Sequence, residues 1–111
     1  MPIKYQSKRD RLHAFKINGD SMNRVIKDQS IVIVEKIESL DNIKNGTIVV
    51  ALINGYATVK RIYIDNNIVT LMPDSDSKLF VPTTIDTGYE EINIIGKVIW
   101  HMNPDDVEKY Y

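Results

Sequence analysis

Residues 47–64 read Thr-Ile-Val-Val-Ala-Leu-Ile-Asn-Gly-Tyr-Ala-Thr-Val-Lys-Arg-Ile-Tyr-Ile, and this stretch decides the fold. Asn54-Gly55 stands between two runs rich in β-branched residues. This pattern predicts a β-hairpin, because a type I′ turn needs positive φ at both central positions. The second run therefore returns along the first as a strand. Alternation along that strand puts Lys60 on the same face as Ile62, and Val59 on the other face.

Similar short apolar stretches occur on both sides of the hairpin, separated by Asn, Asp and Gly, and no sustained helical period is present. The expected strands are 12–17, 30–37, 47–53, 56–64, 68–72, 79–81 and 92–102. The fold class is therefore mainly β, and six or seven short strands predict a compact, strongly bent sheet or a barrel-like domain. We expect residues 1–11 to be a charged linker remnant, 12–103 to be the domain and 104–111 to be a C-terminal tail.

The composition excludes several classes of protein. The chain has 111 residues, enough for one ordinary domain, and a formal net charge of −1, which provides no general basic field for a phosphate backbone. With no cysteine and two histidines, we expect no disulfide, no thiolate catalysis, no metal site and no cofactor. The apolar runs are far shorter than the roughly 20 residues that cross a bilayer, and residues 1–9 lack the apolar segment of a signal peptide. We therefore expect a cytoplasmic protein without a membrane anchor.

Ser21 and Lys60 are the residues that suggest chemistry. Ser21 lies in Gly19-Asp20-Ser21-Met22-Asn23, where Gly19 relaxes the backbone and Asp20 can cap a turn. Such a turn can present the serine hydroxyl beside backbone N–H groups that stabilise an oxyanion. The hydroxyl needs a base, and a desolvated lysine amine can serve without histidine. Taken singly, an ordinary loop serine and a solvent-facing lysine are the simpler interpretations.

The face on which Lys60 lies decides whether its amine can act as a base. Burial penalises the charged form of lysine and lowers its pKa. A fall from about 10.4 to about 7 to 8 would suit a general base near neutral pH. Both faces of the strand carry apolar residues, however, so periodicity favours an inward Lys60 only modestly.

The order of motifs along the chain resembles the self-cleaving C-terminal domain of LexA-like and phage repressors, a family that includes the UmuD mutagenesis proteins. The resemblance extends roughly over residues 14–103. The matching segments are Phe15-Lys16-Ile17-Asn18-Gly19-Asp20-Ser21-Met22, Ser30-Ile31-Val32-Ile33-Val34, Asn45-Gly46-Thr47-Ile48-Val49-Val50, Thr58-Val59-Lys60-Arg61-Ile62, Leu71-Met72-Pro73, Phe80-Val81-Pro82 and Ile94-Ile95-Gly96-Lys97-Val98-Ile99-Trp100. Their order and spacing together make the resemblance specific.

The resemblance implies that Ser21 is the nucleophile and Lys60 the general base, with Met22 on the oxyanion side of the turn. It also implies a mostly β domain that forms a homodimer and cuts a peptide bond of its own chain, upstream of the domain. In repressors of this family the cut separates the dimerising domain from a DNA-binding helix-turn-helix domain, and a RecA filament promotes it. Without dimerisation two operator half-sites no longer reinforce one another, so self-cleavage would relieve repression.

Four features depart from the family pattern. Asn23-Arg24 stands where proline often follows the Ser-Met pair, and Asp28-Gln29-Ser30 stands where glycine is common. The Ala-Gly or Cys-Gly dipeptide that the family usually cuts is missing, so we expect the cleaved bond to lie outside this chain. A helix-turn-helix is missing too, which we interpret as the sign of a C-terminal fragment of a longer repressor. The alternative is a gene product of this length.

Two further alternatives stay open. Ile99, Trp100 and Met102 end the last expected strand, and they either complete the core or anchor a dimer. The function also has a second candidate, a dimerisation module that retains the Ser-Lys pair without using it and is switched off by an antirepressor protein. A signal peptidase shares Ser-Lys chemistry, but it would normally bring a membrane anchor.

Overall fold

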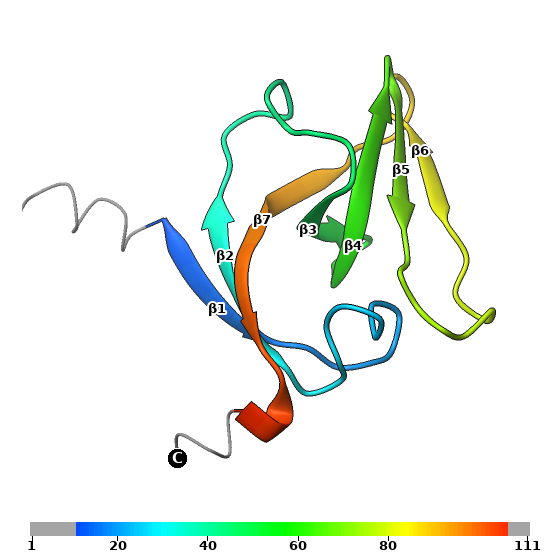
Figure 1. Ribbon diagram of the computed structural model, residues 1–111. Helices are drawn as coiled ribbons and strands as arrows, with labels where there is room; N and C mark the ends of the chain where they lie inside the picture. The colour runs from blue at the N-terminus through cyan, green and yellow to red at the C-terminus, as the bar shows by residue number, and fades with distance from the viewer. Residues whose placement is uncertain (1–10, 107–111) are drawn as a thin grey trace, which may run out of the picture.

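The computed structural model describes residues 11–106, which form one seven-stranded antiparallel sheet (Figure 1). In the order β1-β2-β7-β3-β4-β5-β6, the first and last strands are open edges and the sheet does not close into a barrel. The prediction of a mainly β, strongly bent sheet is confirmed. The strands are β1 (Leu12–Lys16), β2 (Ile31–Lys36), β3 (Thr47–Ile53), β4 (Tyr56–Asp65), β5 (Ile68–Met72), β6 (Thr83–Asp86) and β7 (Asn93–Met102).

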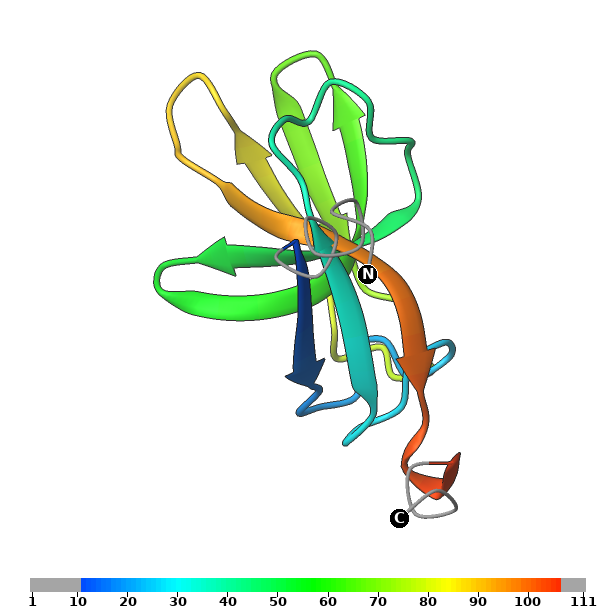
Figure 2. The same cartoon turned by 90° about the vertical axis from the view of Figure 1, so that its left-hand side faces the viewer.

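The hairpin expected from residues 47–64 is confirmed as β3 and β4. Its register runs from Thr47 opposite Ile62 to Ile53 opposite Tyr56. Asn54 has φ 50° and the following glycine has φ 83°, as the two central positions of a type I′ turn require. The hairpin projects across the direction of β1 and β2 (Figure 2), so the sheet bends strongly between them.

β7 produces much of this bend. Its first half pairs with β3 and its second half pairs with β2, and the register shifts once in each ladder. Such bulges bend a strand and increase its twist. Gly96 lies where the two ladders overlap, opposite both Lys36 and Val50, and a Cβ there would lie 2.3 Å from the Glu35 carbonyl oxygen. Only glycine allows β2 and β7 to approach this closely.

The strand expected at 79–81 is wrong. β6 instead begins at Thr83, and its register with β5 ends at Leu71 opposite Thr83. Residues 79–81 therefore lie beyond the end of β5, where they have no partner strand. Leu79 is 89% exposed and Val81 is 68% exposed, so this apolar run belongs to the connection between β5 and β6.

Apolar side chains fill both faces of β3, which divides the core into two clusters. The first contains Val49, Ala51, Ile62, Val69, Leu71 and Ile85. The second contains Met22, Ile26, Val32, Val34 and Val50. β4 contributes to both, since Ile62 belongs to the first cluster and Val59 packs against the second. The two clusters thus fix the strand that carries Lys60.

The expected linker and tail fall largely on residues 1–10 and 107–111, which lie outside the described residues. Arg11, the last residue of the expected linker, already pairs with the domain: its carbonyl accepts a 2.8 Å hydrogen bond from the N–H of Lys36. Within residues 11–106 no helix is long and apolar enough to cross a membrane.

Candidate active site

Ser21 lies in a tight turn between β1 and β2. The N–H of Asn23 bonds the carbonyl of Asp20 at 3.3 Å, and the carbonyl of Met22 accepts bonds from the next turn of the chain. Gly19 has φ 117°, a conformation that other residues rarely adopt. Met22 is 1% exposed and packs in the second cluster, so the core fixes this turn from below.

Asp28 holds the beginning of the turn. Its carboxylate accepts a 2.7 Å bond from the N–H of Gly19 and a 3.0 Å bond from the side-chain amide of Gln29. The Gly19 N–H, followed by the Gln29 amide, lowers the pKa of Asp28 below its ordinary value. This residue does what the sequence interpretation assigned to Asp20, for which the structure shows no side-chain bond within the described residues.

The loop after β5 fastens the other side of the turn. The N–H of Asp74 bonds the carbonyl of Ser21 at 2.9 Å, and its carbonyl accepts a bond from the N–H of Arg24 at 3.1 Å. Asn23 and Asp76 form two further hydrogen bonds. The side-chain amide of Asn23 donates to the Asp76 carboxylate at 2.8 Å, and the N–H of Asp76 donates to the side-chain oxygen of Asn23 at 3.0 Å. In Figure 1 this loop passes beside the turn, below the start of β4. The side-chain amide of Asn23 thus links two loops.

Lys60 reaches Ser21 from β4. Its Nζ lies 2.8 Å from Ser21 Oγ, 2.6 Å from Thr58 Oγ1 and 3.2 Å from the carbonyl oxygen of Val59. Burial lowers the pKa of the amine below the ordinary lysine value. The two residues that the sequence interpretation paired, 39 positions apart, are therefore in hydrogen-bond contact.

Thr58 is a contact that the sequence interpretation missed. Residues two apart on a strand point to the same side, so the Thr58-Val59-Lys60 order already placed a hydroxyl beside the amine. The signal is weak, because threonine is common in strands for reasons of packing.

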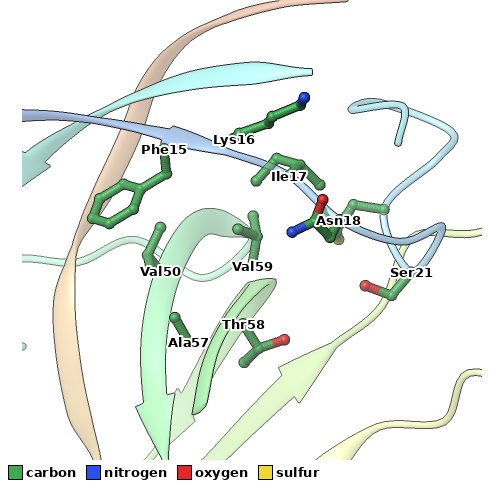
Figure 3. A pocket seen from close by; sticks show the side chains of 10 residues that line it. Phe15, Lys16, Ile17, Asn18, Ser21, Val50, Ala57, Thr58 and Val59 are labelled. Carbon is green, nitrogen blue, oxygen red and sulfur yellow. The ribbon is translucent and has the colours of Figure 1, made fainter. Parts of the chain in front are cut away.

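A pocket of about 250 Å³ opens beside Ser21, between the end of β1 and the start of β4. Its walls combine apolar and polar side chains, and Ser21 Oγ points toward it (Figure 3). Lys16 contributes to the rim, but its side chain points away. The complete lining is Phe15, Lys16, Ile17, Asn18, Ser21, Met22, Val50, Ala57, Thr58 and Val59.

The other residues singled out in the sequence lie elsewhere. Ile99, Trp100 and Met102 are on the second half of β7, beside β2, and none of them lines the pocket. Ile99 and Trp100 are each 47% exposed, whereas Met102 is half-buried. The structure does not bring this group together with Ser21 and Lys60.

A serine hydroxyl in hydrogen-bond contact with a half-buried lysine amine is a pair whose chemistry can support nucleophilic attack on a carbonyl. The comparison with known families agrees with this chemistry. The family described as Peptidase S24-like matches residues 1–99, and the chain belongs to this family.

The curated relatives are repressors. The LexA repressor of Clostridium tetani is 38% identical over 100 residues, which covers 89% of this chain and 46% of the relative. That of Clostridium perfringens strain 13 is 36% identical over 101 residues, covering 89% and 45%. That of Magnetococcus marinus is 37% identical over 86 residues, covering 78% and 35%. The chain spans about half the length, or less, of these relatives, and the resemblance to the LexA-type peptidase domain is confirmed.

Proposed function

We propose that this chain is the self-cleaving domain of a LexA-like repressor, with Ser21 as nucleophile and Lys60 as general base. The observation that carries the proposal is the 2.8 Å contact between Lys60 Nζ and Ser21 Oγ. In the first step the neutral amine takes the hydroxyl proton while Oγ bonds the carbonyl carbon of the substrate. The ammonium then returns that proton to the leaving nitrogen as the peptide bond breaks. Water hydrolyses the resulting ester by the same route.

The contacts of Lys60 fit the amine in its reactive form. A neutral amine has two N–H donors and one lone pair, whereas an ammonium has three donors and no lone pair. If Thr58 Oγ1 and the Val59 carbonyl accept the two N–H groups, the lone pair faces Ser21 Oγ, where it receives the hydroxyl proton. Partial burial favours this neutral form because it lowers the pKa of the amine.

The backbone of the Ser21 turn supplies donors for the oxyanion. Within the described part of the chain, the N–H groups of Ser21 and Met22 form no hydrogen bond. We propose that they bind the substrate oxygen once it becomes negative, since preorganised backbone donors are worth most at that stage. Gly19 and Asp20 shape the turn that presents them.

An open stretch of backbone offers a place for the substrate. β5 pairs with β4 only from Arg61 onward, so residues 56–60 have a partner strand on one side alone. An extended peptide added along this edge would pass Ser21 and place alternate side chains in the pocket. We propose that the segment upstream of the domain, in the longer protein, binds in this way.

For the longer protein we propose a cytoplasmic repressor that binds DNA through a domain outside this chain and dimerises through this one. Cleavage would separate the two functions and relieve repression, with a RecA filament as the expected promoter. The exposed Ile99 and Trp100 are the proposed dimer anchors. Sedimentation of Trp100→Glu beside wild type tests this: a monomer supports the assignment, and an unchanged dimer contradicts it.

Cleavage is tested with the parent protein, or with its upstream segment supplied as a peptide, at neutral and alkaline pH. We expect cleavage to speed up with pH and to disappear in Ser21→Ala and in Lys60→Ala, while both variants remain folded. Cleavage that persists in both variants contradicts the proposal. A folded wild-type domain that never cleaves, yet dimerises tightly, points instead to a dimerisation module controlled by an antirepressor.

A further inference from the structure

Arg61, the neighbour of Lys60 on β4, forms the better buried of the two ion pairs within residues 11–106. Its Nε lies 3.0 Å from Asp74 Oδ2, and its Nη1 donates a 2.8 Å bond to the carbonyl of Gly46. The side chains of Arg61 and Asp74 are 29% and 25% exposed. One guanidinium thus connects the strand that carries Lys60 with the loop after β5.

Asp74 extends this connection to the nucleophile. Its carboxylate faces Arg61, while its backbone N–H bonds the Ser21 carbonyl at 2.9 Å and its carbonyl accepts from Arg24 at 3.1 Å. This series of contacts therefore begins and ends next to the reacting groups. Arg61 directly follows Lys60 in the sequence, and Asp74 bonds Ser21 itself. The Asp28 contact joins the turn to its own segment, and the paired Asn23–Asp76 bonds join it to the loop after β5, but neither of these contacts reaches β4.

We propose that Arg61 and Asp74 are positioning residues that act as a unit and hold the Ser21 hydroxyl within reach of Lys60. This inference rests on the proposed roles of Ser21 and Lys60. Neither residue touches the reacting atoms. Their effect is on geometry, and a displacement of about 1 Å at a reacting group can cost about 100-fold in rate.

The guanidinium is suited to this role because its donors lie in a rigid plane. It bonds the carboxylate with one edge and the Gly46 carbonyl with another nitrogen. A lysine at position 61 would keep the charge but could not hold both acceptors in the same fixed geometry. Arg61→Lys should therefore retain only part of the function, even though it retains the charge.

The experiment uses the chain itself and an alkyl fluorophosphonate as the probe. Ser21 Oγ attacks the phosphorus, fluoride leaves, and the hydroxyl proton passes to Lys60, so the labelling rate reports the activated serine without any knowledge of the natural substrate. Intact mass measures labelling from neutral to alkaline pH, and Ser21→Ala confirms the labelled residue. The variants are Arg61→Ala, Asp74→Ala, their double variant and Arg61→Lys. Lys97→Ala removes the other ion pair, 3.8 Å from Glu35, and is the matched control.

We expect each single alanine variant to label about 10- to 100-fold more slowly than wild type, and the double variant to be no slower than the slower single variant. The rise of rate with pH should flatten in these variants, because Lys60 no longer faces Ser21. Arg61→Lys should be intermediate and Lys97→Ala unchanged. A merely structural role would lower the folded fraction without altering the shape of the pH profile.

Unchanged rates in both single variants overturn the inference, and so do losses that multiply in the double variant. If the wild-type chain does not label at all, the proposed catalytic function fails, and crystal structures then decide the positioning role separately. A Ser21 Oγ to Lys60 Nζ separation beyond hydrogen-bond distance in Arg61→Ala supports positioning. A separation equal to that of wild type refutes it.

Discussion

Replacing Thr58 with valine removes one acceptor from Lys60 while nearly keeping the side-chain shape. Thr58 Oγ1 is 2.6 Å from Lys60 Nζ, the shortest of the three contacts of the amine. A hydrogen bond from a charged donor is worth about 1.5–3 kcal/mol, and partial exposure favours the lower figure. The neutral amine would lose a weaker bond of about 0.5 kcal/mol to the same oxygen, so the difference of about 1 kcal/mol shifts the balance roughly fivefold toward the amine. Thr58→Val should therefore lower the pKa of Lys60 further.

The fluorophosphonate labelling rate, measured against pH, shows both consequences of this change. The midpoint of the rising profile should move to lower pH by about 0.7 pH unit, because the amine loses its proton more easily. The plateau should fall by about tenfold, because the amine has lost a bond that orients its lone pair toward Ser21. Thr70→Val, on β5 and half-buried like Thr58, is the matched control and should change neither value.

An unchanged midpoint, or one displaced to higher pH, would refute the idea that Thr58 stabilises the ammonium. A lower midpoint with an unchanged plateau would show that Thr58 acts on the charge of Lys60 alone and has no part in orienting it.

Three further predictions concern stability, measured by urea unfolding. Gly96→Ala should lower the free energy of unfolding by about 3 kcal/mol, because the new Cβ would clash with the Glu35 carbonyl oxygen in a strand that pairs on both sides. Gly55→Ala, where a Cβ would have no atom within 4 Å, should lower it less. Lys60→Met should raise the free energy of unfolding by about 1 kcal/mol at neutral pH. Burial lowers the pKa of Lys60, so its charged form destabilises the wild-type protein at pH values below that pKa, and the advantage of the variant should fade as the wild type deprotonates in alkali. Asp28→Asn should be less stable at neutral pH, and the difference should vanish as pH falls through the lowered pKa of Asp28.

Local sequence signals predicted the strands best where turn residues and the alternation of apolar residues agreed. Asn54-Gly55 fixed both the turn and the register of β3 and β4, because few dipeptides adopt positive φ at two successive positions. The run at 79–81 misled because apolar content marks a strand only where a partner is present, and β5 ends before that point. Strand pairing over a distance is not written in the local pattern.

The candidate site was predictable in part for the same reason. Ser21 and Lys60 were paired through the resemblance to a family, since nothing in their local sequences states that they meet. The contacts of Asp74 and Asp28 were missed because each involves a backbone group, which carries no sequence signal, and because Asp74 bonds a residue in another loop. The half-burial of Lys60 was only modestly favoured by alternation, and it depends on how the Ser21 turn packs against the first half of β4.

The open backbone of residues 56–60 also bears on the colloidal behaviour of the protein. Unpaired strand edges seed association between molecules, and a charged side chain directed inward is one of the ways in which proteins prevent it. Lys60 is the last residue of this stretch, and its amine is charged at pH values below its lowered pKa. Tyr56, at the other end, is 79% exposed. Lys60→Met, the variant expected to resist urea better, should therefore aggregate more readily. Selection of variants by thermal stability alone would therefore replace Lys60 and yield proteins that resist unfolding but are poorly soluble.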